Sequence, residues 1–479
     1  MGNLAEGTGA APGARWLGSG SGAASGRFAF WRRPMSLEAR RLLAWLALWV
    51  VIANIGFSFL WLIGSPPRWS AIAFTAIAGG FVRKGPALLK AATFLCAVTY
   101  SIVTFISDLF GLSVAQIFSS LSILPEMRLT AAPEYMAGAG LLLLLVGAGV
   151  WLARRDMAFT TPRSALIALG VVSAWAATDV AVAMNGQGSY GRSASSTTSF
   201  ESAVELSGFL KGADAGHHLV LINVEAMGLP LDPALLAKLF SRFHDGRVGA
   251  RYEVTQGSSL FFGSTVTAEM RELCERWDDQ ASVMEKADPT CLPASLRGKG
   301  YETSALHGFK AEFYDRATWY PNAGFQHMRF RDDLVGREVS ECPGVFPGAC
   351  DKDIPALISQ QIKSATQPQF IYWMTLNSHF PVPSVEALGT TRCELFDPAL
   401  ASAAPMVCRM LQIWDRNFRA LAEQITAADF PATDILIVGD HRPPFYDRKQ
   451  RSMFAPDRVP WILLRAKDPA PAPGHGTGR

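Results

Sequence analysis

Three apolar runs in the second half of the sequence each lead into side chains that bind metal ions or move protons. They are residues 218–223 before Glu225, residues 370–376 before His379, and residues 434–438 before Asp440 and His441. Continuous apolar runs of this length are typical of parallel strands that are buried on both faces. Because open α/β sheets bind ligands at the carboxyl ends of their strands, we expect these side chains to meet at one edge of a sheet. Three such runs ending in metal-ligand residue types rarely arise by chance.

A fourth element is the small-residue turn at residues 262–269, which contains Gly263 and Thr265 and opens a helical pattern. The N-terminus of a helix offers free N–H groups and a partial positive charge, which suits a phosphate. A hydroxyl group at that position becomes a nucleophile when a metal ion lowers its pKa. The alternative is a Ser or Thr that caps the helix, which is the commoner use of these residues and the one that the turn alone favours.

Helical segments that can position these strands lie between them, at residues 233–244, 267–277, 354–364 and 406–427. This alternation predicts an α/β domain with a mostly parallel central sheet between helices. We place the domain at residues 217–466 and expect a flexible Pro- and Gly-rich tail at residues 467–479.

The first part of the sequence has a different composition. The chain has 479 residues, of which 49% are hydrophobic and 18% are charged, whereas a soluble chain carries about 25% charged residues. The excess lies in five apolar runs, at residues 42–63, 69–82, 91–106, 135–153 and 165–184. Runs of about 20 residues cross a bilayer, and the run at 69–82 is the shortest of the five. We predict a transmembrane helical domain of about five spans at residues 39–185, in preference to buried core helices.

Basic residues set the expected orientation of these spans. They lie before the first run and in alternate loops: Arg27, Arg32, Arg33, Arg40, Arg41; Arg83, Lys84, Lys90; and Arg154, Arg155, Arg163. Five spans with a cytoplasmic N-terminus satisfy the positive-inside rule at every loop, whereas four would place one cluster on the wrong side. This topology predicts a disordered basic cytoplasmic tail at 1–38 and a linker along the membrane at 186–216, with everything beyond outside the cytoplasm. The net charge of +3 is too small to indicate a nucleic-acid partner.

Six of the seven cysteines lie in the part of the chain expected in an oxidising compartment. An even number suggests three disulfides, and pairing of neighbours is the simplest arrangement: Cys274–Cys291, Cys342–Cys350 and Cys393–Cys408. Other pairings are open at this point, and a zinc cluster is the rival, although no CxxC spacing occurs.

The soluble part resembles the alkaline phosphatase and sulfatase superfamily. More narrowly, it is similar to membrane-anchored lipoteichoic acid synthases, glucan phosphoglycerol transferases and lipid A phosphoethanolamine transferases. The resemblance rests on Gly263-x-Thr265-x-x-x-Glu269, Asn377-x-His379-Phe380-Pro381 and Gly439-Asp440-His441, in this order. The likeness implies a multi-pass protein of a bacterial inner (cytoplasmic) membrane with its catalytic domain in the periplasm.

The resemblance also implies roles for individual residues. The residues that it implies for one divalent metal ion, compatible with Zn²⁺ or Mn²⁺, are Glu225, Thr265, Asp440 and His441. Thr265 matches the nucleophile of the family, and His379 matches a histidine that contacts the substrate.

The stretch from Leu306 to Arg316 resembles a segment of the synthases. By that match His307, Tyr314 and Arg316 would bind phosphate or glycerol, and an arginine suits bidentate phosphate contact. Core packing is an equally good interpretation of Tyr314, and a surface ion pair is the alternative for Arg316.

One short segment resembles the sulfatase nucleophile motif, C-x-P-S/A-R. The sequence has Cys291-x-Pro293-Ala294, but Arg297 is displaced by two residues and the segment lies well past the Thr265 turn. Sulfatases carry a pair of acidic residues after the first strand, whereas this sequence has the single residue Glu225 there. We therefore interpret Cys291 as a disulfide partner.

The implied activity is transfer of a phospho-alcohol head group, with phosphoglycerol favoured, from a phospholipid donor through a phospho-threonine to a cell-envelope glycan or lipid acceptor. The donor would be phosphatidylglycerol or phosphatidylethanolamine. The alternatives are a phosphoethanolamine transferase acting on lipid A or another envelope glycan, and a membrane-anchored phosphodiesterase or sulfatase-like hydrolase. A non-enzymatic sensor is disfavoured by the complete Glu-Thr-Asp-His set.

Overall fold

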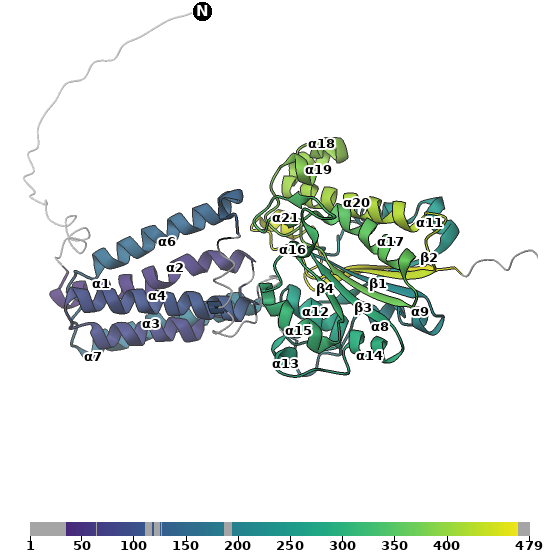
Figure 1. Cartoon of the computed structure of the whole chain (residues 1–479). Coiled ribbons are helices and arrows are strands. Elements are labelled where there is room, and N and C mark those ends of the chain that lie inside the picture. The colour runs from purple at the N-terminus through teal and green to yellow at the C-terminus, as the bar shows by residue number, and fades with distance from the viewer. Residues whose placement is uncertain are drawn as a thin grey trace, which may run out of the picture.

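The structure is a computed structural model that describes residues 35–467 except residues 64, 111–116, 119–124, 126 and 186–193. Most of the two tails predicted at residues 1–38 and 467–479 lies outside the described residues, as does the first part of the predicted linker. A bundle of long helices lies at one end of the molecule and an α/β domain at the other (Figure 1).

Five apolar helical segments of the bundle lie within the described residues. They are α1–η3 (α1 Leu37–Leu46, η2 Ala47–Ile52, α2 Ala53–Ser58, η3 Phe59–Ile63), α3 (Trp69–Val82), α4 (Ala87–Phe110), α6 (Pro133–Leu152) and α7 (Pro162–Asn185). Among the described residues, four stretches are long and apolar enough to cross a membrane: Leu37–Trp61, Ala87–Leu109, Pro133–Leu152 and Pro162–Ala183. The apolar helical region is thus confirmed. The 14 residues of α3 extend about 21 Å, short of a hydrocarbon core of about 30 Å, so a fifth crossing stays a prediction.

The basic loops of the bundle meet at one end of it. Arg41 pairs with Asp156 at 2.6 Å, and Lys90 Nζ donates to the carbonyl oxygen of Arg155 at 2.6 Å. At the other end, Asp179 accepts hydrogen bonds from Trp61 Nε1 at 2.9 Å and from the backbone N–H of Arg68 at 2.5 Å. Because α3 starts beside Asp179 and ends at the basic end, consecutive segments run in alternating directions (Figure 1).

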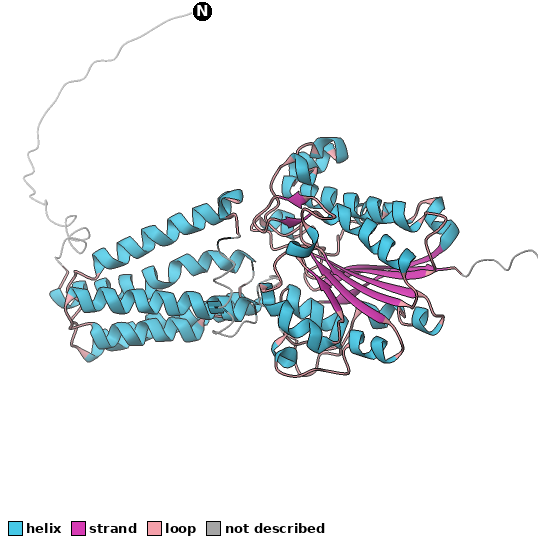
Figure 2. Cartoon of the chain, viewed as in Figure 1, coloured by secondary structure: helices cyan, strands magenta, loops and turns pink. Residues whose placement is uncertain are grey.

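A seven-stranded sheet forms the centre of the α/β domain, in the order β2-β9-β8-β1-β7-β3-β4 (Figure 2). Its strands are β1 (His218–Val224), β2 (Tyr252–Leu260), β3 (Glu302–His307), β4 (His327–Arg329), β7 (Gln369–Met374), β8 (Thr433–Gly439) and β9 (Arg458–Ala466). The strands from β8 to β4 are parallel to their neighbours, and β9 is antiparallel to both β2 and β8. The predicted mostly parallel sheet is confirmed.

Helices cover both faces of this sheet. Because alternate residues of a strand point to opposite faces, each strand contributes side chains to both cores. Val220 and Ile222 face the core under α10 (Pro233–Leu239), α17 (Ile354–Ser364) and α20 (Pro405–Ile425). Leu219 and Leu221 face the core under α12 (Thr265–Cys274), α14 (Leu292–Gly298) and α15 (Arg316–Ala323). The strands are buried on both faces, which explains their continuous apolar sequences.

Shorter elements complete the domain. They are α8 (Ala203–Ser207), α9 (Lys211–Asp214), η6 (Ser241–Phe243), α11 (Gly246–Arg251), α13 (Ala281–Met284), η7 (Phe313–Asp315), α16 (Arg331–Leu334), β5 (Glu341–Cys342), β6 (Gly348–Ala349), η8 (Asp351–Asp353), η9 (Glu386–Leu388), α18 (Cys393–Phe396), α19 (Pro398–Ala403) and α21 (Arg448–Arg451); η5 (Leu129–Ala131) precedes α6.

The last part of the predicted linker is folded onto the domain. The Glu272 carboxylate accepts the backbone N–H groups of Ala203 at 3.2 Å and Val204 at 3.0 Å, which caps α8 against α12. A buried carboxylate that receives the free N–H groups at a helix start holds that helix in place. The chain is therefore fixed to the domain from about residue 202 and not first from residue 217.

All three predicted disulfides are present: Cys274–Cys291, Cys342–Cys350 and Cys393–Cys408. The rival zinc cluster is therefore wrong. The first bond ties the end of α12 to the start of α14, so Cys291 is a disulfide partner, as expected.

Candidate metal centre and nucleophile

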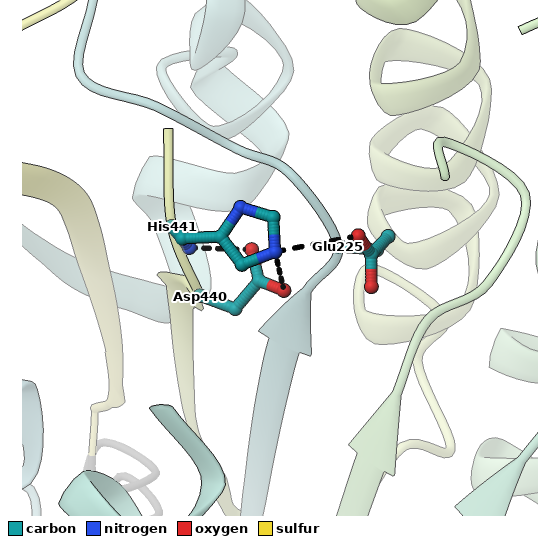
Figure 3. Close-up of side chains that lie close together, drawn as sticks. All are labelled: Glu225, Asp440 and His441. Atoms are coloured by element: carbon teal, nitrogen blue, oxygen red, sulfur yellow. Dashed lines mark hydrogen bonds and ion pairs between the residues drawn. The ribbon is translucent and has the colours of Figure 1, made fainter. Parts of the chain in front are cut away.

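Glu225, Asp440 and His441 converge at the carboxyl edge of the sheet (Figure 3). Each offers one ligand atom, and these atoms lie within 4.8 Å of one another in a buried position. β1 and β8 are parallel neighbours in which Val224 pairs with Gly439, so the residues that follow both strands must emerge side by side. Register alone therefore brings together residues more than 200 positions apart in the sequence.

The Asp440 carboxylate is held by one oxygen only. Its Oδ1 accepts the backbone N–H groups of Ala226 at 2.7 Å and His441 at 2.5 Å. Its Oδ2 is buried and accepts no hydrogen bond among the described residues. A buried carboxylate oxygen without a donor is costly, and a metal ion is the partner that fits such an atom.

The imidazole of His441 presents a lone pair to the same point. Its Nδ1 lies 3.1 Å from the carbonyl oxygen of Arg442. Because a carbonyl can only accept, Nδ1 carries a proton, which makes Nε2 the ring nitrogen that can coordinate a metal ion. Nε2 lies 3.3 Å from Asp440 Oδ2 and 3.6 Å from Glu225 Oε1. In metal sites, a ligating histidine is typically oriented by a hydrogen bond from its other ring nitrogen, as Nδ1 of His441 makes here to Arg442.

Electron-rich atoms that face one another in a buried site repel unless a cation lies between them. Burial, together with the charge of Asp440, raises the pKa of Glu225 well above its ordinary value. Burial also raises the pKa of Asp440, against the opposing effect of His441. The three ligands thus fit a divalent cation, with the mixture of carboxylate and imidazole that suits Zn²⁺ or Mn²⁺.

Thr265 places its hydroxyl group at the rim of this cluster. Its Oγ1 donates to Glu225 Oε2 at 3.2 Å and lies 3.3 Å from His441 Nε2. Thr265 is the first residue of α12, and the N-cap position is held by Ser264, which makes no side-chain capping bond. The capping interpretation therefore does not describe Thr265. Gly263 shapes this turn, because its φ of +65° and the nearby Thr267 hydroxyl leave no room for a Cβ.

Two of the histidines predicted to bind substrate lie near this cluster. His307 ends β3, and its Nδ1 donates to the carbonyl oxygen of Met374 at 3.1 Å. Its Nε2 is buried and has no hydrogen-bond partner within the described part of the chain. Burial and then the charge of Arg316 hold the pKa of His307 well below its ordinary value. Burial and then His441 lower the pKa of His379 to about 4. Both imidazoles are neutral at neutral pH.

Arg316 forms a buried ion pair, whereas the sequence suggested a phosphate ligand or a surface pair. Its Nη2 and Nε donate to Glu269 Oε2 at 2.8 and 3.2 Å, and Nη1 donates to the carbonyl oxygen of Phe313. Its side chain is 1% exposed. Each of its three nitrogens has an acceptor on the protein. The geometry therefore supports a role for Arg316 in positioning the neighbouring elements, and direct phosphate contact stays a prediction.

Tyr314 is buried in the core beneath α12, with φ of +58°, a conformation that non-glycine residues rarely adopt. Burial raises the pKa of its hydroxyl far above the usual range, and a hydrogen bond with Ser264 opposes this shift. Core packing describes Tyr314, and its place beside the Thr265 turn leaves substrate contact as a prediction.

Sequence reasoning missed the residues that hold the loops of the site. Glu269 stood in the quoted motif without a role, and it accepts hydrogen bonds from Tyr320 at 2.5 Å and Tyr372 at 3.2 Å as well as from Arg316. Asp351 accepts the backbone N–H groups of Leu376 and Asn377, at 3.0 and 2.7 Å, and so fixes the loop after β7. The strand before Asp351, β6, has only two residues, so no apolar run in the sequence marks this position.

Residues 251–476 match the family model described as Sulfatase. The chain contains a sulfatase-family domain. The match confirms the superfamily expected from the sequence, and it includes Thr265, Asp440 and His441 but begins after Glu225. Because Cys291 is bonded to Cys274, this sulfatase-family domain does not use Cys291 as its nucleophile.

The curated relative that matches is a Rhizobium meliloti (strain 1021) protein to which cyclic beta-1,2-glucan modification is provisionally attributed. It is 26% identical over 155 residues, which is 32% of this chain, and the match spans only 23% of the relative.

Among solved structures, lipoteichoic acid synthase LtaP of Listeria monocytogenes is 18% identical, with a TM-score of 0.40 over 53% of this chain and 66% of that chain. Phosphoglycerol transferase GacH of Streptococcus pyogenes is 17% identical, with a TM-score of 0.37 over 57% and 78%. The periplasmic domain of EptC of Escherichia coli is 10% identical, with a TM-score of 0.35 over 53% and 73%.

Proposed function

We propose that this protein is a metal-dependent transferase that moves a phospho-alcohol head group, phosphoglycerol in the favoured case, from a phospholipid to a cell-envelope glycan or lipid. The observation that carries the proposal is the position of the Thr265 hydroxyl group. It lies within 3.3 Å of both Glu225 and His441, at the start of a helix and beside three converging metal ligands. A nucleophile, a cation site and a helix N-terminus are together what phosphoryl transfer through a covalent intermediate needs.

Glu225, Asp440 and His441 would hold the divalent ion. When bound, the ion lowers the pKa of a hydroxyl group beside it and offsets charge on phosphoryl oxygens. The fit rests on the Oδ2 of Asp440, which accepts no hydrogen bond among the described residues, and on the Nε2 of His441, which lies 3.3 Å from it.

The protein's own residues carry the rest of the reaction. Thr265 Oγ1 attacks the phosphorus of the donor, so that a threonine–phosphorus bond forms and the bond from phosphorus to the diacylglycerol oxygen breaks. The hydroxyl proton leaves toward Glu225, to which Thr265 already donates, and the diacylglycerol oxygen takes up a proton in exchange. An acceptor hydroxyl then reverses these steps and frees Thr265. Neutral His307 and His379 border the site without adding positive charge.

The position of the basic residues in the bundle supports a location for the sulfatase-family domain. The basic end of the bundle lies opposite the end that meets the α/β domain (Figure 1). By the positive-inside rule the basic end would be cytoplasmic, which supports a sulfatase-family domain on the outer side of a bacterial inner membrane, in the periplasm. A tethered site beside the bilayer meets lipid donors at high local concentration.

The test is a mass measurement on the full-length protein in lipid nanodiscs that contain either phosphatidylglycerol or phosphatidylethanolamine. The expected result is a phosphoglycerol adduct on the peptide that carries Thr265, together with release of diacylglycerol. A phosphoethanolamine adduct would replace the favoured donor with the other one.

Two variants test the role of Thr265, and the choice of acceptor separates a transferase from a hydrolase. Thr265→Ala should give no adduct and no diacylglycerol, while Thr267→Ala, on the same helical turn, should give both. Lipid cleavage with water as acceptor in the presence of candidate glycans would indicate a phosphodiesterase. The absence of an adduct with either lipid, with equal turnover in Thr265→Ala, would contradict the proposal.

A further inference from the structure

An apolar cavity of about 510 Å³ lies inside the bundle, between the first segment, α4 and α6. Its walls are aliphatic and aromatic, from residues such as Leu60, Val98, Ile102, Leu142 and Val146. One of its lining residues, Tyr446, belongs to the sulfatase-family domain. This volume lies in the range of sites that bind organic ligands in proteins.

The cavity exists because α6 packs closely at one end and separates toward the other. A Cβ on Gly149 would lie 2.2 Å from Phe94 of α4, so these helices touch near the basic end. A Cβ on Gly56 would lie 2.9 Å from Leu145. Gly138 also lines the cavity, yet a Cβ there would meet nothing within 4 Å. The open part therefore lies toward Pro133, where α6 begins and the sulfatase-family domain is nearest.

The end near the domain is polar, unlike the walls. Glu134 lines the cavity, and its Oε2 is buried with no hydrogen-bond partner among the residues that the structure describes. Burial, and then the charge of Glu134, raises the pKa of Tyr446. Arg409 lies close enough to Glu134 for their charges to interact. An apolar cavity with a charged and hydroxylated end is complementary to an amphiphile.

A short series of contacts joins this polar end to the candidate metal centre. The ring of Tyr446 lies 5.6 Å from the ring of Phe380, measured between centroids. Phe380 directly follows His379, whose pKa is affected by His441. A ligand whose polar end lies at Tyr446 is therefore next to the loop that borders Thr265.

We propose that this cavity binds the acyl chains of the glycerophospholipid donor, with its glycerol end at Glu134 and Tyr446. The proposal rests on the proposed function, since it assigns the lipid part of that substrate to a place in the chain. Helices long enough to cross a bilayer surround the cavity, so lipid is the amphiphile available to it. The cavity orients the donor, and the chemistry stays with Thr265.

The test uses the full-length protein in nanodiscs with phosphatidylglycerol or phosphatidylethanolamine that carries a diazirine on one acyl chain. Photolysis should label peptides of α2, α4 and α6 at the cavity. Gly138→Leu fills the open space and should reduce this labelling by about tenfold. Gly140→Leu is the matched control, because it makes the same change on the same exposed helix, also meets nothing within 4 Å, and does not line the cavity.

Kinetics provides the second measurement. Gly138→Leu should raise the KM for a long-chain donor by about tenfold and leave the KM for a donor with two four-carbon chains unchanged. Equal labelling in the two glycine variants, spread over lipid-facing helix surfaces, would mean bulk lipid only and would overturn the proposal. Cavity labelling with no adduct on Thr265 would support the lipid site while overturning the proposed function.

Discussion

Two buried carboxylate clusters lie on either side of Thr265, and they differ in where their positive charge comes from. Glu269 has its own cation, the Arg316 guanidinium, and two tyrosine hydroxyl groups complete its hydrogen bonds. Glu225 faces a second carboxylate and the Nε2 atom of the His441 imidazole. Both clusters are buried and rich in polar atoms, so burial and residue type do not tell them apart. The source of positive charge distinguishes them. The Glu269 cluster has its cation within the protein, and the Glu225 cluster needs a metal ion.

The largest expected effect comes from removing one ligand of the incomplete cluster. Asp440→Asn keeps Oδ1 as an acceptor for its two N–H donors and removes the charge that a metal ion requires. Activity on the lipid donor should fall by at least about 10³-fold. The melting temperature of the metal-free variant should equal or exceed that of the metal-free parent, because a repulsion between carboxylates is gone. A clear loss of stability without metal would contradict this comparison.

The opposite behaviour is expected at the complete cluster. Glu269→Gln leaves a buried guanidinium without its counter-ion, which costs about 3–5 kcal/mol in free energy of unfolding. The melting temperature should fall by about 6–20 °C. Glu269→Gln combined with Arg316→Met should recover most of the loss, since it removes the stranded charge. A single variant as stable as the parent would show that the pair is dispensable.

Metal binding should release protons, because burial and the charge of Asp440 raise the pKa of Glu225, and the ion displaces the proton that this shift favours. Affinity for the ion should therefore increase as the pH rises, since fewer protons compete for the ligands. Calorimetric titration of the metal-free protein in two buffers with different ionisation enthalpies measures the number released. The number of protons released per ion should decrease as the pH rises, and a value of zero at all pH values would be inconsistent with two facing carboxylates.

The smallest effect concerns Asp351, a buried carboxyl with backbone donors and no facing cation. Burial raises its pKa from 3.8 to about 7. The folded state therefore binds this proton more tightly than the unfolded state, so stability falls as the pH rises from about 4 to 7, by at most about 1.4 kcal/mol per pH unit. Asp351→Asn should flatten that slope in thermal unfolding series. Identical slopes in both proteins would contradict the assignment.

The sequence could predict features that depend on local pattern. Continuous apolar runs identified β1, β7 and β8, and the residues just after β1 and β8 meet because those strands are parallel neighbours. Cysteines close in sequence paired as expected. Partnerships between distant residues could not be predicted: Glu269 and Arg316 are 47 residues apart and belong to different elements. The cavity depends on how far α6 separates from α4, which single-helix patterns do not encode.

The most direct test of the central claim is the metal content of the full-length protein, measured by native mass spectrometry after loading with Zn²⁺ or Mn²⁺ and removal of excess ion. The account predicts one ion per chain in the parent, one in the Glu269→Gln/Arg316→Met double variant, and none in Asp440→Asn. A parent protein that retains no ion, or an Asp440→Asn variant that retains as much as the parent, would contradict it.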